Sequence, residues 1–166
     1  MDYNIFTIRD KQVAGAIALL LFCERFSVYH KDLAELINHL FGIARANDLG
    51  KWEQEGLIIE IIGRGESVAD TVLYGLDKFV KDDLSIIIEF VIEIGIADMY
   101  GATTNQPSLF LEKALQVLKK NNIEFILPQR VFMSTKNDTA WGQLWDEERY
   151  KLLIMIYREL LQNHAV

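Results

Sequence analysis

The stretch LSIIIEFVIEI, residues 84–94, decides the fold class of this chain. Its β-branched residues favour a strand, whereas its length favours a helix, because the apolar run continues to Met99. Asp82 and Asp83 stand where negative charge stabilises a helix N-terminus, and Gly101 is a typical helix stop. We therefore expect a helix of about five turns. It would be apolar on nearly every side and would lie at the centre of the fold.

Other segments show the i, i+3, i+4 spacing of apolar residues that indicates amphipathic helices. Asp10 and Ser67 stand where N-caps are expected, and Pro107 is well placed in a first helical turn. These signals predict five further helices, over about residues 11–28, 31–46, 68–80, 107–120 and 141–162.

Strand signals are fewer and shorter. Residues 123–127 and 130–134 flank Pro128-Gln129 and form the best candidate for a hairpin. The alternation in Tyr3–Ile8 predicts a short strand, and residues 57–62, among four glycines, fit a strand or a short buried helix equally well. We expect a mainly α (α+β) architecture over residues 1–166: a single-domain helical fold with a small antiparallel β-hairpin or sheet.

Composition limits the classes of partner. The chain has 166 residues, 51% of them hydrophobic, which is enough for one packed core. Its net charge of −7 disfavours direct binding to nucleic acid, because phosphate contacts need clustered Lys and Arg. The same acidity suits docking onto a basic protein, although a solvated acidic surface is the simpler explanation. The only cysteine, Cys23, lies in an apolar run and is expected to be a buried, inert thiol.

The longest apolar stretch near the N-terminus does not fit a targeting signal. Val13–Cys23 is eleven residues long, too short to span a bilayer, and Glu24-Arg25 closes it. Asp2 and Asp10 stand where a signal peptide would carry positive charge. We therefore expect a cytoplasmic protein without membrane contact.

Motifs for catalysis or metal binding are incomplete. Gly63-Arg64-Gly65-Glu66-Ser67 lacks the Gly-Lys-Ser/Thr ending of a phosphate loop, and none of the three histidines has zinc-ligand spacing. Glu89 and Glu93 would share one helix face, a spacing used by acid/base pairs and carboxylate-bridged metals, but no Glu-x-x-His element accompanies them. We expect no catalytic residue, no cofactor and no metal, and keep an enzyme that uses Glu89 and Glu93 as an alternative.

The densest aromatic and acidic patch comprises Trp141, Trp145 and Asp146-Glu147-Glu148. Aromatic side chains supply anchoring area in protein interfaces, and charges steer a partner of opposite sign. Because the two tryptophans are four residues apart, a pair facing the core beside an acidic helix start is the competing explanation.

The segments FTIRDK (residues 6–11) and NNIEF (residues 121–125), with the overall character of the chain, resemble immunity proteins of bacterial contact-dependent growth inhibition systems. The resemblance implies a 1:1 complex with a cognate toxin domain, often a nuclease, whose active or substrate-binding site is blocked. Some members accept a toxin hairpin on a strand edge, which implies the same use of the candidate hairpin. A helical adaptor with another partner is the alternative. The partner-binding residues expected from hairpin and patch are Glu124, Arg130, Val131, Phe132, Met133, Ser134, Trp141, Trp145, Asp146, Glu147 and Glu148.

Overall fold

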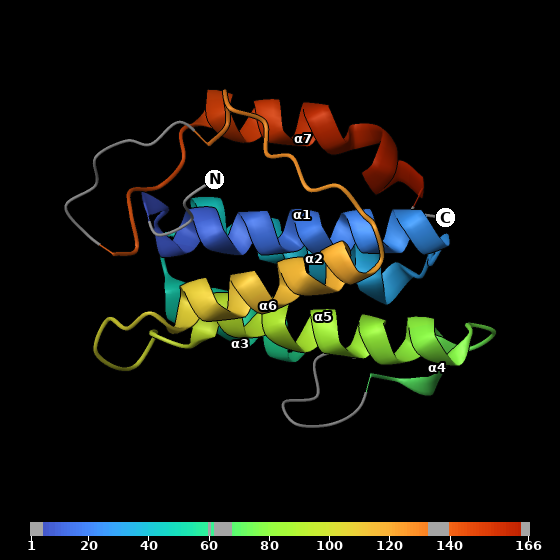
Figure 1. The fold of residues 1–166 in the computed structure, drawn as a ribbon. Coiled ribbons are helices and arrows are strands. Elements are labelled where there is room, and N and C mark those ends of the chain that lie inside the picture. Colours follow the sequence, from blue (N-terminus) through green and yellow to red (C-terminus); the bar gives the residue numbers. More distant parts are fainter. Residues whose placement is uncertain (1–4, 60, 62–67, 133–139, 164–166) are drawn as a thin grey trace.

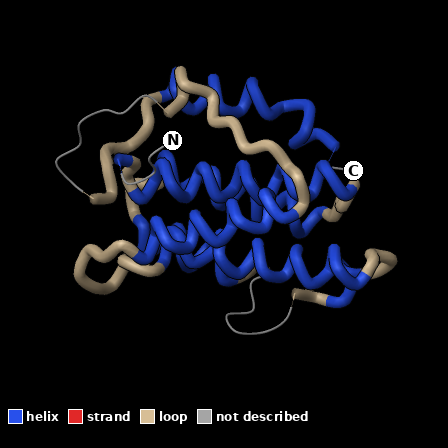
Figure 2. The backbone as a smooth tube through the Cα atoms, in the orientation of Figure 1, coloured by secondary structure: helices blue, strands red, loops and turns tan. Residues whose placement is uncertain are grey.

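The computed structural model describes residues 5–59, 61, 68–132 and 140–163. Within these ranges the chain forms seven α-helices and no strand (Figures 1 and 2). Their bounds are α1 Ile8–Phe26, α2 Lys31–Gly42, α3 Leu49–Leu57, α4 Asp70–Leu73, α5 Lys78–Ile96, α6 Gln106–Lys120 and α7 Glu147–Asn163, with a 3₁₀ turn at Ile43–Arg45. The expected helical architecture is confirmed, and its β component is wrong for these residues. None of the described helices is both long and apolar enough to cross a membrane.

The central helix is α1 rather than α5. Every residue from Ile8 to Leu20 is buried, and Figure 1 shows α7 on one side of α1 and α5 and α6 on the other. Small residues make this possible: a Cβ at Gly15 would lie 2.6 Å from Ile94 Cδ1 of α5. α5 is helical, as predicted from residues 84–94, but it leaves Ile86 and Glu89 exposed. The expectation that α5 is the innermost helix is therefore wrong.

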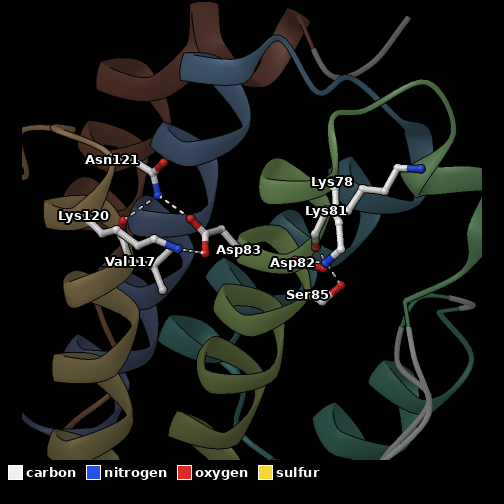
Figure 3. A network of polar contacts seen from close by, with 8 residues as sticks. All are labelled: Lys78, Lys81, Asp82, Asp83, Ser85, Val117, Lys120 and Asn121. Carbon is white, nitrogen blue, oxygen red and sulfur yellow. Dashed lines mark hydrogen bonds and ion pairs between the residues drawn. The ribbon is translucent and has the colours of Figure 1, made fainter.

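A buried carboxylate fastens α5 to α6 (Figure 3). Asp83 is 2% exposed and accepts hydrogen bonds from Lys120 Nζ at 2.6 Å and from Asn121 Nδ2 at 2.8 Å. Asn121 Nδ2 also donates to the Val117 carbonyl, 2.9 Å away. Because Asp83 is near the start of α5 and Lys120 ends α6, these bonds fix the two helices in antiparallel register.

The start of α1 differs from its prediction by one turn. Thr7, not Asp10, is the N-cap: its side chain accepts from the Asp10 amide, and the Asp10 carboxylate accepts from the Thr7 amide. Ile8 is the first helical residue, so the predicted strand over Tyr3–Ile8 is wrong for residues 5–8, and the rest lies outside the described residues. The reciprocal capping of Thr7 and Asp10 favours helix over strand here.

Two glycines set helix boundaries that the apolar spacing did not indicate. Gly75 has φ +76° and separates the short α4 from α5, so residues 68–80 are not one helix. Gly142 has φ +75°, and α7 begins only at Glu147 rather than at Trp141. Left-handed backbone at a glycine interrupts a helix even where apolar residues continue the periodicity.

Residues 49–57 form α3 although glycines interrupt their pattern. Gly56 packs against His39 of α2, where a Cβ would lie 2.6 Å from His39 Nε2. Leu57 ends the helix, and Ile58 and Ile59 continue in a turn. The open question over residues 57–62 is thus answered only in part: residues 57–59 are not strand, and residues 60 and 62 lie outside the described part.

The predicted hairpin is wrong in the described residues. Residues 123–127 form no strand, and the amides of Val131 and Phe132 both donate to the Pro128 carbonyl, at 2.9 and 3.2 Å. Pro128 lacks an amide proton and fixes its own φ, so it begins a turn here instead of connecting two paired strands. Met133 and Ser134 lie outside the described residues.

Candidate functional site

The eleven predicted partner-binding residues separate by burial. Five charged residues are exposed: Glu124, Arg130, Asp146, Glu147 and Glu148. Val131, Phe132 and Trp145 are buried, at 0%, 6% and 4% exposure, and Trp141 is half-buried. Met133 and Ser134 are not among the described residues. Side chains of the buried three can shape a surface but are not themselves exposed to a partner.

Trp145 belongs to a polar cluster at the start of α1. Its indole Nε1 donates to Asp10 Oδ1 at 3.0 Å, and Arg149 Nη2 donates to the same oxygen at 2.6 Å. The Arg149 guanidinium also lies 3.6 Å from the Trp145 ring centroid, a cation–π contact. We call Asp10, Trp145 and Arg149 the Asp10 cluster.

The Asp10 cluster ties three distant segments together. Arg149 Nε donates to the Val131 carbonyl at 2.6 Å, and the Trp145 amide donates to the Ala44 carbonyl at 2.8 Å. Phe132 packs edge-on against the Trp145 ring, with centroids 5.7 Å apart. Residues 121–132, which follow α6 and which we call the connector, are therefore held at their end by the Asp10 cluster, together with the first turn of α7.

The acidic triplet at the start of α7 is largely engaged within the chain. Asp146 Oδ1 accepts from the Arg149 amide at 2.7 Å, which caps the helix. Glu147 pairs with Arg45 at 2.5 Å and with Lys151 at 3.2 Å. The hydrogen bond from Lys151 and the charge of Arg45 lower the pKa of the Glu147 carboxyl. The competing explanation from the sequence, in which tryptophan faces the core beside an acidic helix start, therefore fits Trp145 and this triplet.

A groove lies between the connector and α7. It has a volume of about 580 Å³ and is lined by Phe125, Ile126, Leu127, Pro128, Gln129, Arg130 and Ile156. Ile126 is 66% exposed and Ile156 is 43% exposed, and Arg130, which is also exposed, is the charged residue of the lining. An apolar centre with polar groups beside it is the usual composition of a protein–protein contact. Ile126 and Gln129 lie within the predicted hairpin but were not among the predicted partner-binding residues, and Ile156 lies outside it, because the groove joins residues about thirty positions apart.

A second open groove of about 530 Å³ lies beside α3. His39 and Trp52 stack in it with ring centroids 4.7 Å apart, and burial lowers the pKa of His39, with a partial opposing effect from Glu55. Its two cations have acidic partners: Arg45 pairs with Glu147, and Lys51 lies 3.7 Å from Glu55. Each of its two cations therefore has a carboxylate beside it, and Asp48 adds a further acidic group to the lining.

Buried polar residues at the start of α1 are the most unexpected feature. Arg9, Asp10, Lys11 and Gln12 are all less than 10% exposed. Arg9 donates to the Ile43 carbonyl and, at 2.9 Å, to the Ala46 carbonyl, so its charge stabilises the end of α2 and the 3₁₀ turn. Burial lowers the pKa of Lys11, and the charges of Asp98 and Asp10 oppose that shift. Four consecutive polar residues gave no sign of burial in the sequence, because only a central helix buries all its faces.

Glu89 and Glu93 lie one turn apart on α5, Glu89 exposed and Glu93 half-buried. In the part of the chain that the structure covers, no group of three His, Cys, Asp or Glu side chains is placed to hold a metal ion.

Comparison with protein-family models, curated proteins and solved structures finds no match to this chain. Its function is therefore inferred from its own residues.

Proposed function

We propose that this protein binds and neutralises a cognate bacterial toxin domain, as an immunity protein of a contact-dependent growth inhibition system. The toxin is a nuclease whose active or substrate-binding site is blocked in a 1:1 complex in the cytoplasm. The protein itself contributes binding rather than catalysis, and needs neither a cofactor nor contact with nucleic acid or membrane.

The groove between the connector and Ile156 is the observation that carries this proposal. Its apolar centre offers the anchoring area of an interface, and Gln129 and Arg130 offer polar groups beside it. The Asp10 cluster holds the residue that follows the groove-lining segment, through the bond from Arg149 to the Val131 carbonyl. Because the connector side of the groove is held in place, it loses little conformational entropy on binding, which favours tight complexes. The net charge of −7 favours a basic partner such as a nuclease.

The groove replaces the predicted strand edge as the contact surface. The amides of Val131 and Phe132 donate to Pro128 and cannot also pair with a toxin strand while this turn persists. Contact through side chains at Ile126 and Ile156 therefore fits the described residues better than β-augmentation at residues 130–132.

Co-expression with the product of the adjacent upstream gene tests the proposal. The two proteins should copurify in equal amounts, and cells producing the toxin domain should grow only when this protein is present. Copurification with an unrelated partner and no protection would favour a helical adaptor instead. Absence of any complex with the neighbouring gene product would count against an immunity function.

A matched pair of variants locates the contact. Ile126→Glu places a charge in the groove, whereas Ile58→Glu changes an isoleucine that is 82% exposed at the end of α3, outside the groove. Because the complex would bury Ile126, losing this isoleucine should cost about 1.5–3 kcal/mol of binding energy, a weakening of about 10- to 100-fold. Protection should fall with Ile126→Glu alone, and equal melting temperatures of both variants should exclude unfolding as the cause.

A further inference from the structure

Arg130 is the only charged residue in the lining of the groove between the connector and α7. Five of the other six lining residues are apolar, and the sixth is Gln129. Arg130 is exposed, and a guanidinium keeps its positive charge at physiological pH. A partner that covers the groove must therefore leave this charge in water or supply an acceptor for it.

The chain does not supply that acceptor itself. Arg45 and Arg149 each pair with a carboxylate of the chain, at 2.5 and 2.6 Å. Among the described residues, no hydrogen bond or ion pair engages the guanidinium of Arg130. Its hydrogen-bond donors are therefore available to a partner in the groove.

The backbone that carries Arg130 is held in place. Arg130 lies in the turn where the amides of Val131 and Phe132 donate to the Pro128 carbonyl, at 2.9 and 3.2 Å. Val131, the next residue, is fully buried, and its carbonyl accepts from Arg149 Nε at 2.6 Å. The turn therefore keeps the start of the Arg130 side chain at one place beside the apolar centre of the groove.

A carboxylate is the acceptor that fits this guanidinium best. It accepts two parallel hydrogen bonds from the fork of N–H groups and also neutralises the charge, whereas a carbonyl oxygen leaves the charge uncompensated. A guanidinium covered by an apolar surface would lose its hydration without any interaction that offsets the loss. Both arguments favour an acidic side chain on the partner at this point.

We propose that the toxin segment seated in the groove carries an Asp or Glu that pairs with Arg130, beside an apolar side chain that packs on Ile126 and Ile156. The pairing rests on the proposed function, because it concerns the same groove. It specifies a local carboxylate on a toxin domain whose overall charge is basic.

Two charge reversals separate this local pair from long-range attraction. Arg130→Glu and Arg158→Glu change the net charge equally, and Arg158 is an exposed arginine of α7 outside the lining. Long-range attraction alone predicts that both variants bind a basic toxin domain at least as tightly as the parent. The proposed pair predicts that the complex of Arg130→Glu alone dissociates at least about tenfold faster, because two carboxylates then face each other.

Surface plasmon resonance with the toxin domain of the adjacent gene measures both dissociation rates, and melting temperatures equal to that of the parent show that the variants are folded. Equal dissociation rates of Arg130→Glu and Arg158→Glu would overturn the pairing while leaving the proposed function intact. If the parent itself forms no complex, the proposed function fails and the pairing fails with it.

Zero-length cross-linking identifies the acceptor. Arg130→Lys keeps the positive charge and adds an amine that a carbodiimide couples to a neighbouring carboxylate. In the complex, position 130 should form an amide with one Asp or Glu of the toxin domain, detected by mass spectrometry of the digested product. Arg158→Lys is the control and should form none. A complex of Arg130→Lys without coupling at position 130 would indicate a carbonyl acceptor and would overturn the proposal.

Discussion

Removing the Asp10 carboxylate should destabilise the protein more than removing any exposed aspartate. Asp10 accepts from the Thr7 amide and hydroxyl at 3.2 and 2.7 Å, from Trp145 Nε1 at 3.0 Å and from Arg149 Nη2 at 2.6 Å. Asp10→Ala removes both acceptor oxygens and with them all four hydrogen bonds. The buried Trp145 indole then keeps a donor without a partner, which is costlier than losing an exposed hydrogen bond.

The size of the effect follows from these contacts. Loss of the Asp10 half of the α1 capping box costs up to about 1 kcal/mol, because Thr7 still caps the helix, and the unsatisfied indole costs about 1–3 kcal/mol. Breaking a buried ion pair costs about 3–5 kcal/mol. Loss of the Arg149–Asp10 pair should cost less than this range, because the Arg149 side chain is 19% exposed and keeps its bond to the Val131 carbonyl. Since the three losses share one residue and are not additive, we expect about 3–5 kcal/mol in total.

Urea unfolding followed by circular dichroism measures this loss, with an unchanged m-value as evidence that both states keep their compactness. Asp77→Ala is the matched control, because Asp77 is the N-cap of α5 but its side chain makes no capping hydrogen bond. It should change the free energy of unfolding by less than about 0.5 kcal/mol. If Asp10→Ala also stays within about 1 kcal/mol of the parent, the Asp10 cluster does not hold the connector and α7 as described.

Three further predictions concern single residues. Gly142→Ala should destabilise the protein by at least about 1 kcal/mol more than Gly75→Ala in the same urea assay. Both glycines have positive φ, but only at Gly142 would the new Cβ lie 2.6 Å from the Thr7 side chain. Equal losses of stability would contradict this packing. Burial lowers the folded-state pKa of His39, so the unfolded chain binds the His39 proton at higher pH than the folded chain does. The free energy of unfolding should therefore decrease as the pH falls through about 6.5, and His39→Gln should reduce this decrease in urea titrations at pH 5.5 and 8. Identical pH profiles of the parent and the variant would refute this. Burial raises the pKa of the fully buried Cys23 thiol, so a thiol-specific chromogenic reagent should label it only as the chain unfolds, and rapid labelling of the native protein would show that the core is open there.

Much of the helical content could be predicted because the deciding signals are local. Apolar spacing in residues 31–46 and the long run at residues 84–94 indicate helices whatever the tertiary contacts, and α2 and α5 are present. The boundaries failed at Gly75, whose positive φ separates α4 from α5, and before α7, where Gly142 has positive φ and Asp146 caps the helix start. Nothing in the apolar pattern shows whether a glycine adopts positive φ.

The connector shows why the hairpin prediction failed. β-branched and aromatic residues on both sides of Pro128 have the composition of paired strands. In the fold, Leu127, Val131 and Phe132 instead insert separately into the core, and a turn forms at Pro128. Composition indicates that such residues will be buried, but not whether they pack against a neighbouring strand or against helices.

The candidate site was only partly accessible from sequence. The acidic triplet and Trp145 were found because they are neighbours in the chain, and Asp146, Glu147 and Glu148 are exposed. The Asp10 cluster could not be found, because its contacts join positions 135 and 139 residues apart. The groove was missed for the same reason: Ile126 and Ile156 become neighbours only when the connector and α7 pack together.

Titration calorimetry of the purified toxin domain from the adjacent gene into this protein tests the central claim most directly. We predict saturation at one toxin domain per chain, with Ile126→Glu weakening the complex by about 10- to 100-fold and Ile58→Glu binding as the parent does. No binding by the folded parent, or equal affinities of the two variants, would contradict a toxin-binding groove between the connector and α7.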